Sequence, residues 1–247
     1  MSTALLAETP VQEYTPKAFS TLPLFRDSKN ALKKQKANLC PVGSVIVKHG
    51  LEEKMGVSLL HKHFPLEESE ILSRSFDTPG RTITMRPVPK QRKDATVPYL
   101  WRAVRESGGK FAYYPLEFVE REYAEELDGF RLDEHLGLLQ DMAYELEKYN
   151  LLNVFGIATL NITKLRENNT ELLVETTDSV NRTLTVKPEP GPVPEGEELT
   201  ETLWTFGPVN PANEEAACKG THCAGHCHGH CLGHCVGHCH GHNPHPE

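Results

Sequence analysis

The chain has 247 residues and a mass of 27.7 kDa, and 38 % of its residues are hydrophobic, which fits one globular domain with appendages rather than two full domains. Its net charge of −8 at pH 7 argues against a nucleic-acid or anionic-membrane partner, because such partners require a coherent basic face. No segment reaches the roughly 18 apolar residues of a membrane span, and the N-terminus lacks the pattern of a secretory signal. We therefore expect a cytoplasmic protein with no membrane partner.

The first part of the chain is polar and interrupted by prolines. Residues 1–38 contain Pro10, Pro16 and Pro23 and show no sustained hydrophobic period, so we expect a disordered arm there. The ordered domain is expected over residues 39–206.

The domain opens with segments in which β-branched and apolar residues cluster or alternate between glycines, as they do in strands. Three strands are predicted first, within residues 43–50, 56–64 and 81–88. A β-hairpin follows, with its strands in residues 99–105 and 110–118 and its turn at residues 107–109.

Helical spacing is found in the middle of the domain. Residues 132–149 place apolar side chains three and four positions apart, which predicts an amphipathic helix. Asp133 is the expected N-cap and Asn150 the expected end of this helix. A shorter helix with acidic residues facing water is predicted over residues 117–127.

Further strand patterns close the domain, within residues 154–162, 170–177 and 181–188. The order of strands, then two helices, then strands predicts an α+β fold with a mostly antiparallel sheet. A linker rich in proline and glutamate is expected at residues 188–198. Residues 200–206 are expected to form a last strand that returns to the domain, because Trp204 is hard to justify in an exposed tail.

The C-terminal tail, residues 207–247, is the part of the sequence that indicates a chemistry. From His222 to Gly241 it repeats the unit HCxG, and residues 218–247 hold six of the seven cysteines and nine of the thirteen histidines. Thiolates and neutral imidazoles prefer zinc, copper(I) and nickel, and a reducing cytosol disfavours a disulfide framework. The predicted metal ligands are Cys218, His222, Cys223, His226, Cys227, His228, His230, Cys231, His234, Cys235, His238, Cys239, His240, His242 and His245.

The spacing of these ligands favours exchange of metal ions over a single fixed ion. Any two adjacent units offer two sulfurs and two nitrogens, so many ligand sets are nearly equivalent. The glycine in every unit opposes helix formation by about 1 kcal/mol relative to alanine, so we expect a flexible, low-complexity tail. Its composition resembles metallothioneins and the histidine-rich tails of nickel and copper chaperones, which implies a role in metal homeostasis and a metal-receiving partner protein. A redox sensor, in which oxidation pairs the cysteines and expels metal, is the alternative for the same residues.

One segment of the domain also has metal-ligand spacing. His61 and His63 lie two apart on a predicted strand, which places them on one face, and Glu67 follows four residues after the second histidine. This spacing resembles the first metal motif of cupins, where an HxH pair and a glutamate share one metal with a later histidine. His135 is the residue available for that fourth position, because no second cupin motif follows. The alternative is that both histidines pack or hydrogen-bond on a half-buried sheet.

The remaining residues predict no catalytic centre. Cys40 precedes a proline in an expected strand-entry turn and is interpreted as a buried small residue, and neither a GxSxG motif nor a phosphate-binding glycine loop is present. Residues 56–70 resemble a segment of uncharacterised proteins of filamentous fungi, a resemblance that extends over much of residues 40–210 and implies no activity. The sequence therefore favours a non-enzymatic metal-binding protein. A metalloenzyme or small-ligand binder that uses His61, His63 and Glu67, and a metal- or redox-responsive interaction module, are the alternatives.

Overall fold

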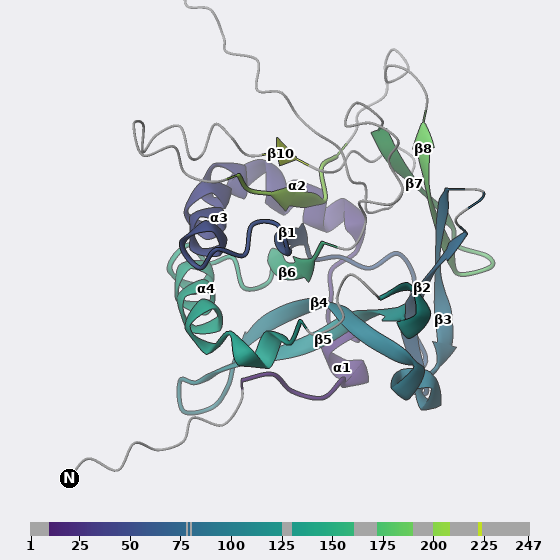
Figure 1. Ribbon diagram of the computed structural model, residues 1–247, viewed down its shortest axis with the longest axis horizontal. Helices are drawn as coiled ribbons and strands as arrows, with labels where there is room; N and C mark the ends of the chain where they lie inside the picture. The colour runs from purple at the N-terminus through teal and green to yellow at the C-terminus, as the bar shows by residue number, and fades with distance from the viewer. Residues whose placement is uncertain are drawn as a thin grey trace, which may run out of the picture.

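The computed structural model describes residues 10–77, 79, 81–124, 130–160, 172–189, 200–207 and 222–223. The strands in these ranges form one large curled sheet, and the helices lie against it (Figure 1). The helical segments are α1 (Pro16–Ser20), α2 (Phe25–Gln35), η1 (Lys36–Asn38), α3 (Leu39–Lys48), η2 (Lys90–Ala95), η3 (Arg121–Tyr123), η5 (Leu132–Glu134) and α4 (Leu136–Lys148). The strands are β1 (Met55–Leu59), β2 (Glu70–Asp77), β3 (Thr82–Pro89), β4 (Thr96–Arg105), β5 (Phe111–Glu120), β6 (Phe155–Thr159), β7 (Leu172–Asp178), β8 (Thr183–Glu189), β9 (Leu203–Thr205) and β10 (His222–Cys223).

The sheet has the strand order β10-β9-β1-β6-β4-β5-β2-β3-β8-β7. Every pairing between these strands is antiparallel except that of β2 with β5. Figure 1 shows α3 and α4 together beside β1 and β6, while β2, β3, β7 and β8 lie on the other side of the molecule. The α+β prediction with a mostly antiparallel sheet is confirmed. None of the helices in the described ranges combines the length and apolar character that a bilayer crossing needs.

The N-terminal region differs from the prediction, because residues 10–38 belong to the fold. Thr15 caps α1 by accepting the Ala18 N–H, and Pro16 occupies the first turn, where a proline costs no helical hydrogen bond. Phe19, Phe25 and Leu32 are buried in the core. Pro16 therefore starts a helix, and the chain is folded from residue 10 onward.

The first predicted strand is also wrong, because residues 39–48 form helix α3. Leu39, Val42, Val45 and Ile46 are buried, and their spacing of three, three and one residues follows one face of a helix. The β-branched residues that suggested a strand pack in this stripe against β1 and α4. Cys40 consequently lies in the first turn of α3, half-buried, and not in a strand-entry turn.

The predicted helix over residues 117–127 is not formed as such. Glu117 to Glu120 end strand β5, and a single 3₁₀ turn, η3, follows; residues 125–129 lie outside the described residues. The helix predicted over residues 132–149 is confirmed as η5 followed by α4. His135, not Asp133, is its N-cap, and Asn150 ends it with a φ of 58°, a left-handed conformation that asparagine tolerates.

The other strand predictions are confirmed at β1, β3, β6, β7, β8 and the β4–β5 hairpin. In the hairpin turn, Gly108 and Gly109 adopt φ values of 93° and 80°, which only glycine reaches without strain. The predicted linker is described only at its start, Pro188 and Glu189, which lie in β8.

The predicted last strand is present as β9, and it pairs with β1. Trp204 is 1 % exposed and packs edge-on against Phe155, with 5.5 Å between the ring centroids. Phe206 lies against α3 where Gly43 leaves room, since a Cβ at position 43 would stand 1.9 Å from the Phe206 ring. The segment before the tail is therefore held in the hydrophobic core.

Candidate functional site

The three residues of the predicted metal motif are not brought together. Strand β1 ends at Leu59, so His61 and His63 follow it in a loop, where they are 1 % and 7 % exposed. Glu67 is exposed, and its backbone N–H donates to the Glu70 carboxylate at 2.9 Å. Among the residues that the structure describes, no three His, Cys, Asp or Glu side chains are arranged to hold a metal ion.

A different glutamate lies beside the histidine pair. Nε2 of His63 is 3.3 Å from Oε1 of Glu175 on β7, and Nδ1 of His63 is 3.4 Å from the Thr177 hydroxyl. His61 lies edge-on to His63 with 4.7 Å between ring centroids, and its Nδ1 is 2.9 Å from the carbonyl oxygen of Leu59. A carbonyl only accepts hydrogen bonds, so this nitrogen of His61 carries the proton.

The loop that carries these histidines is fixed by its backbone. The Leu60 N–H donates to the Val154 carbonyl at 2.8 Å, and the Lys62 N–H donates to the Pro23 carbonyl at 2.9 Å. The Ser28 hydroxyl of α2 donates to the Leu60 carbonyl at 2.7 Å. The N-terminal helices, which the sequence did not predict, thus position the histidine loop.

Strand register places more charged side chains near Glu175. Residues directly opposite each other in a ladder point to the same face. Glu175 is paired with Val186, which is paired in turn with Ile83. Met85, two residues after Ile83, is paired with Arg74. Leu72, two residues before Arg74, is paired with Glu117. Glu175, Arg74 and Glu117 are 0 %, 5 % and 1 % exposed, and we call them, together with His61, His63 and Tyr99, the buried polar cluster.

Electrostatics tie this cluster together. The Tyr99 hydroxyl donates to Glu117, and the Arg74 guanidinium lies over the Tyr99 ring at 3.1 Å from its centroid. Burial lowers the pKa of Arg74 to about 9, while the nearby Glu117 and Glu175 carboxylates act in the opposite direction. The buried guanidinium of Arg74 and the two buried carboxylates near it therefore compensate one another's charge within the buried polar cluster.

The other two histidines of the domain lie elsewhere. Nε2 of His49, at the end of α3, is 3.0 Å from the Asp141 carboxylate on α4, which the Lys48 ammonium also contacts at 2.7 Å. His135 stacks on Phe130 with 5.0 Å between the ring centroids. Neither has a described contact with His61 or His63, so His135 gives the histidine pair no further ligand.

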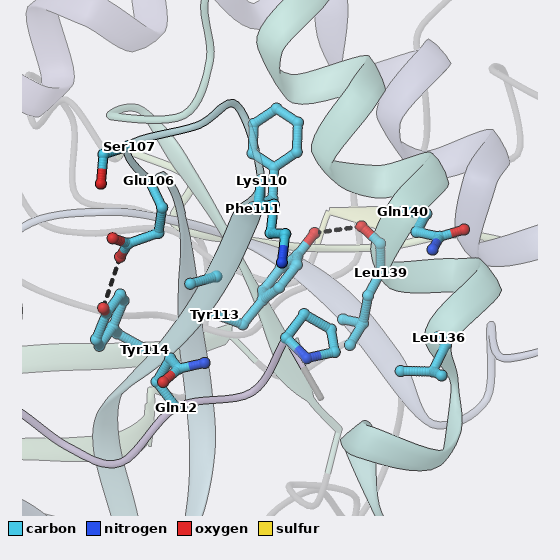
Figure 2. A pocket seen from close by; sticks show the side chains of 12 residues that line it. Gln12, Glu106, Ser107, Lys110, Phe111, Tyr113, Tyr114, Leu136, Leu139 and Gln140 are labelled. Atoms are coloured by element: carbon cyan, nitrogen blue, oxygen red, sulfur yellow. Dashed lines mark hydrogen bonds between the residues drawn. The ribbon is translucent and has the colours of Figure 1, made fainter. Parts of the chain in front are cut away.

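A pocket of about 600 Å³ lies between the β4–β5 hairpin, the N-terminal turns of α4 and residues 10–12 (Figure 2). Tyr113 forms part of its wall, and the Tyr113 hydroxyl donates to the Leu139 carbonyl at 2.8 Å. Tyr114, also in the wall, donates its hydroxyl to Glu106 at 2.6 Å, which raises the pKa of Tyr114. Tyr99, Trp101 and Tyr113 of the hairpin are buried in the core, and Phe111, Tyr113 and Tyr114 line the pocket.

The predicted ligands of the tail lie outside the described residues, except for the backbone of His222 and Cys223, which pairs with Thr205 and Trp204. Comparison of the chain with protein-family models, curated proteins and solved structures finds no match. The resemblances noted from the sequence therefore stay predictions.

Proposed function

We propose that this protein binds soft transition-metal ions in the cytosol through the HCxG repeat of its C-terminal tail, and that it sequesters, buffers or delivers them. The observation that carries the proposal is the concentration of six cysteines and nine histidines in residues 218–247. Zinc, copper(I) and nickel are the metals that such a mixed sulfur and nitrogen set selects. With four ligands per tetrahedral ion, fifteen ligands hold roughly three zinc ions.

The degenerate spacing supports exchange. A structural zinc site has one set of four ligands, whereas each HCxG unit here can combine with the unit on either side. An ion can thus move along the tail by replacing one ligand at a time. This property suits a buffer or a donor to a metal-receiving protein.

The folded domain supports the proposal as the body that carries the tail. Trp204 and Phe206 are buried, and the Leu59 N–H donates to the Thr202 carbonyl at 2.8 Å. The tail thus begins from a strand fixed to the sheet. The alternative metal site at His61, His63 and Glu67 has no comparable support, because Glu67 is exposed and Glu175 takes the place beside His63.

A redox-responsive tail is the second candidate, because the same thiolates that bind metal also form disulfides. Mild peroxide added to the zinc-loaded protein distinguishes the two roles. A sensor releases its zinc within the time that free peroxide persists, whereas a buffer retains most of it.

Cobalt(II) substitution tests the proposed ligands. Cobalt bound by thiolates gives an intense sulfur-to-metal charge-transfer band, and tetrahedral cobalt gives characteristic visible bands. We expect both for the full-length reduced protein. A variant with serine at Cys223, Cys227, Cys231, Cys235 and Cys239 is expected to lose most of the charge-transfer band, because Cys218 is the one tail thiol that it keeps.

The matched control is Cys40→Ser, because Cys40 is the one cysteine that precedes the tail in the sequence. This variant should give the same bands as the unchanged chain. A charge-transfer band that keeps its full intensity after the five tail substitutions would overturn the proposal.

A further inference from the structure

The pocket between the β4–β5 hairpin and α4 has the size and the lining of a small-molecule site. Its volume of about 600 Å³ falls within the range of roughly 300–1,000 Å³ that is usual for ligand pockets. Its walls come from three separate parts of the chain: Pro10 from the N-terminal segment, Phe111 from the hairpin, and Leu136 with Leu139 from α4 (Figure 2). These side chains give it an apolar interior.

Hydrogen bonds between the three parts make the pocket preformed. The Gln12 N–H donates to the Tyr113 carbonyl at 2.8 Å, and the Tyr113 N–H donates to the Pro10 carbonyl at 2.6 Å. The Tyr113 hydroxyl reaches across to the Leu139 carbonyl of α4. The hairpin is therefore fixed both to the N-terminal segment and to the helix, so a ligand need not order these walls on binding.

The polar groups of the pocket select the charge of a ligand. Lys110 contributes an ammonium group, and Gln12 and Gln140 contribute carboxamides that can donate hydrogen bonds. Glu106 is the acidic residue of the lining, and its carboxylate accepts from Tyr114 (Figure 2). An apolar body with an anionic head matches this combination, because the head can meet Lys110 while the body covers Phe111 and Leu136.

We infer that this pocket binds a small amphipathic carboxylate, with its carboxylate at Lys110 and its apolar body between Phe111 and α4. The site is independent of metal binding by the tail. Such a site would give the domain a function of its own, which the proposal of metal binding by the tail does not supply.

Calorimetric titration of the full-length reduced protein with sodium decanoate, in the presence of a metal chelator, tests this inference. We expect saturable binding of one decanoate per chain. Lys110→Gln should weaken it at least tenfold, and Leu136→Glu should do the same by placing a like charge in the wall. Both variants should fold, because Lys110 is exposed and a carboxylate in the first turn of α4 interacts favourably with the helix dipole.

The control is Lys187→Gln, which removes the same charge from an exposed position on β8 and should leave the affinity within twofold. Decanol, which lacks the charge, should bind equally to the unchanged protein and to Lys110→Gln. The inference is overturned if decanoate shows no saturable binding, if Lys110→Gln and Lys187→Gln have equal effects, or if Leu136→Glu binds decanoate as the unchanged protein does.

Discussion

The histidines of this protein occupy two contrasting regions. In the domain, His61 and His63 are buried, and each has its own defined neighbours, the Leu59 carbonyl for one and Glu175 with Thr177 for the other. In the tail, five nearly identical HCxG units, from His222 to Gly241, hold five cysteines and seven histidines. In the domain each of these two imidazoles has specific neighbours, whereas in the sequence of the repeat each imidazole is close to several equivalent ligands.

This difference shows that the spacing of histidines does not decide their chemistry. His61 and His63 have the two-residue spacing of a metal motif. The fold nevertheless places a single carboxylate, that of Glu175, beside the His63 ring within the buried polar cluster. Such a cluster specifies a structure, since every member depends on the others for charge compensation. The repeat has no unique partner for any ligand, and this suits exchange.

Removal of Glu175 is expected to have the largest effect. Glu175→Ala removes the carboxylate beside His63 and one of the two buried carboxylates near Arg74, so the free energy of unfolding should fall by about 3–5 kcal/mol, measured by urea denaturation. Glu67→Ala is the matched control, because Glu67 is exposed, and it should change stability by no more than about 0.5 kcal/mol. Equal effects of the two variants would show that Glu175 is not the partner that the fold requires.

Acidification should release metal from the tail. Thiols with a pKa near 8.5 and imidazoles with a pKa near 6.5 must both lose or lack a proton to bind. We expect the zinc affinity to fall at least a hundredfold between pH 7 and pH 5, which corresponds to about 2.7 kcal/mol. Competition with a chromophoric chelator of known proton affinity measures this change. An affinity that is unchanged at pH 5 would rule out imidazole and thiolate ligands.

The attachment of the tail to the domain can be loosened at Gly43. Gly43→Ala places a Cβ against the Phe206 ring, and such overpacking costs about 1–3 kcal/mol. The emission of Trp204, two residues before Phe206, should shift to longer wavelength as β9 loosens. Ser44→Ala, on the exposed side of the same helix, should leave the emission unchanged. Metal binding by the tail should be unaffected in both variants.

The contact between His49 and Asp141 should show the smallest effect. Hydrogen bonds from Lys48 and His49 lower the pKa of Asp141 below its ordinary value of 3.8. A carboxyl group whose pKa is lower in the folded state stabilises the protein at pH values above its unfolded-state pKa. This contribution is lost as the pH falls through the folded-state pKa. Asp141→Asn should therefore reduce stability at pH 6 by about 0.2–1 kcal/mol, as is usual for an exposed pair, and by progressively less as the pH falls through the folded-state pKa of Asp141. Asp94→Asn, on the exposed turn η2, is the control at each pH value.

Most strands were predictable, and alternation with a period of two survives in β3 and β8. Strand β2 was not predicted. Helix α3 was not predicted, because its β-branched residues favoured a strand, although Leu39, Val42 and Ile46 have helical spacing. The N-terminal helices were missed because their prolines were read as signs of disorder. Pro16 instead lies at a helix start, where its missing N–H is not required.

The buried polar cluster was only half predictable. His61 and His63 were identified from the sequence, but Glu175 lies 112 residues after His63, and only the pairing of β7 with β8 and of β8 with β3 brings it into the cluster. A signal did exist: Arg74 and Glu117 stand at buried positions of apolar strands. A charge at such a position indicates a partner, but the local sequence does not name that partner.

Elemental analysis of protein purified in reductant and dialysed against limited zinc distinguishes metal bound by the tail from metal bound by the domain histidines. We predict roughly three zinc ions per chain for the unchanged protein and for Cys40→Ser. The variant with serine at the five cysteines of the repeat should lose most of this zinc. One zinc ion per chain retained by that variant, and lost on His61→Ala, would contradict the proposal and place the metal in the domain.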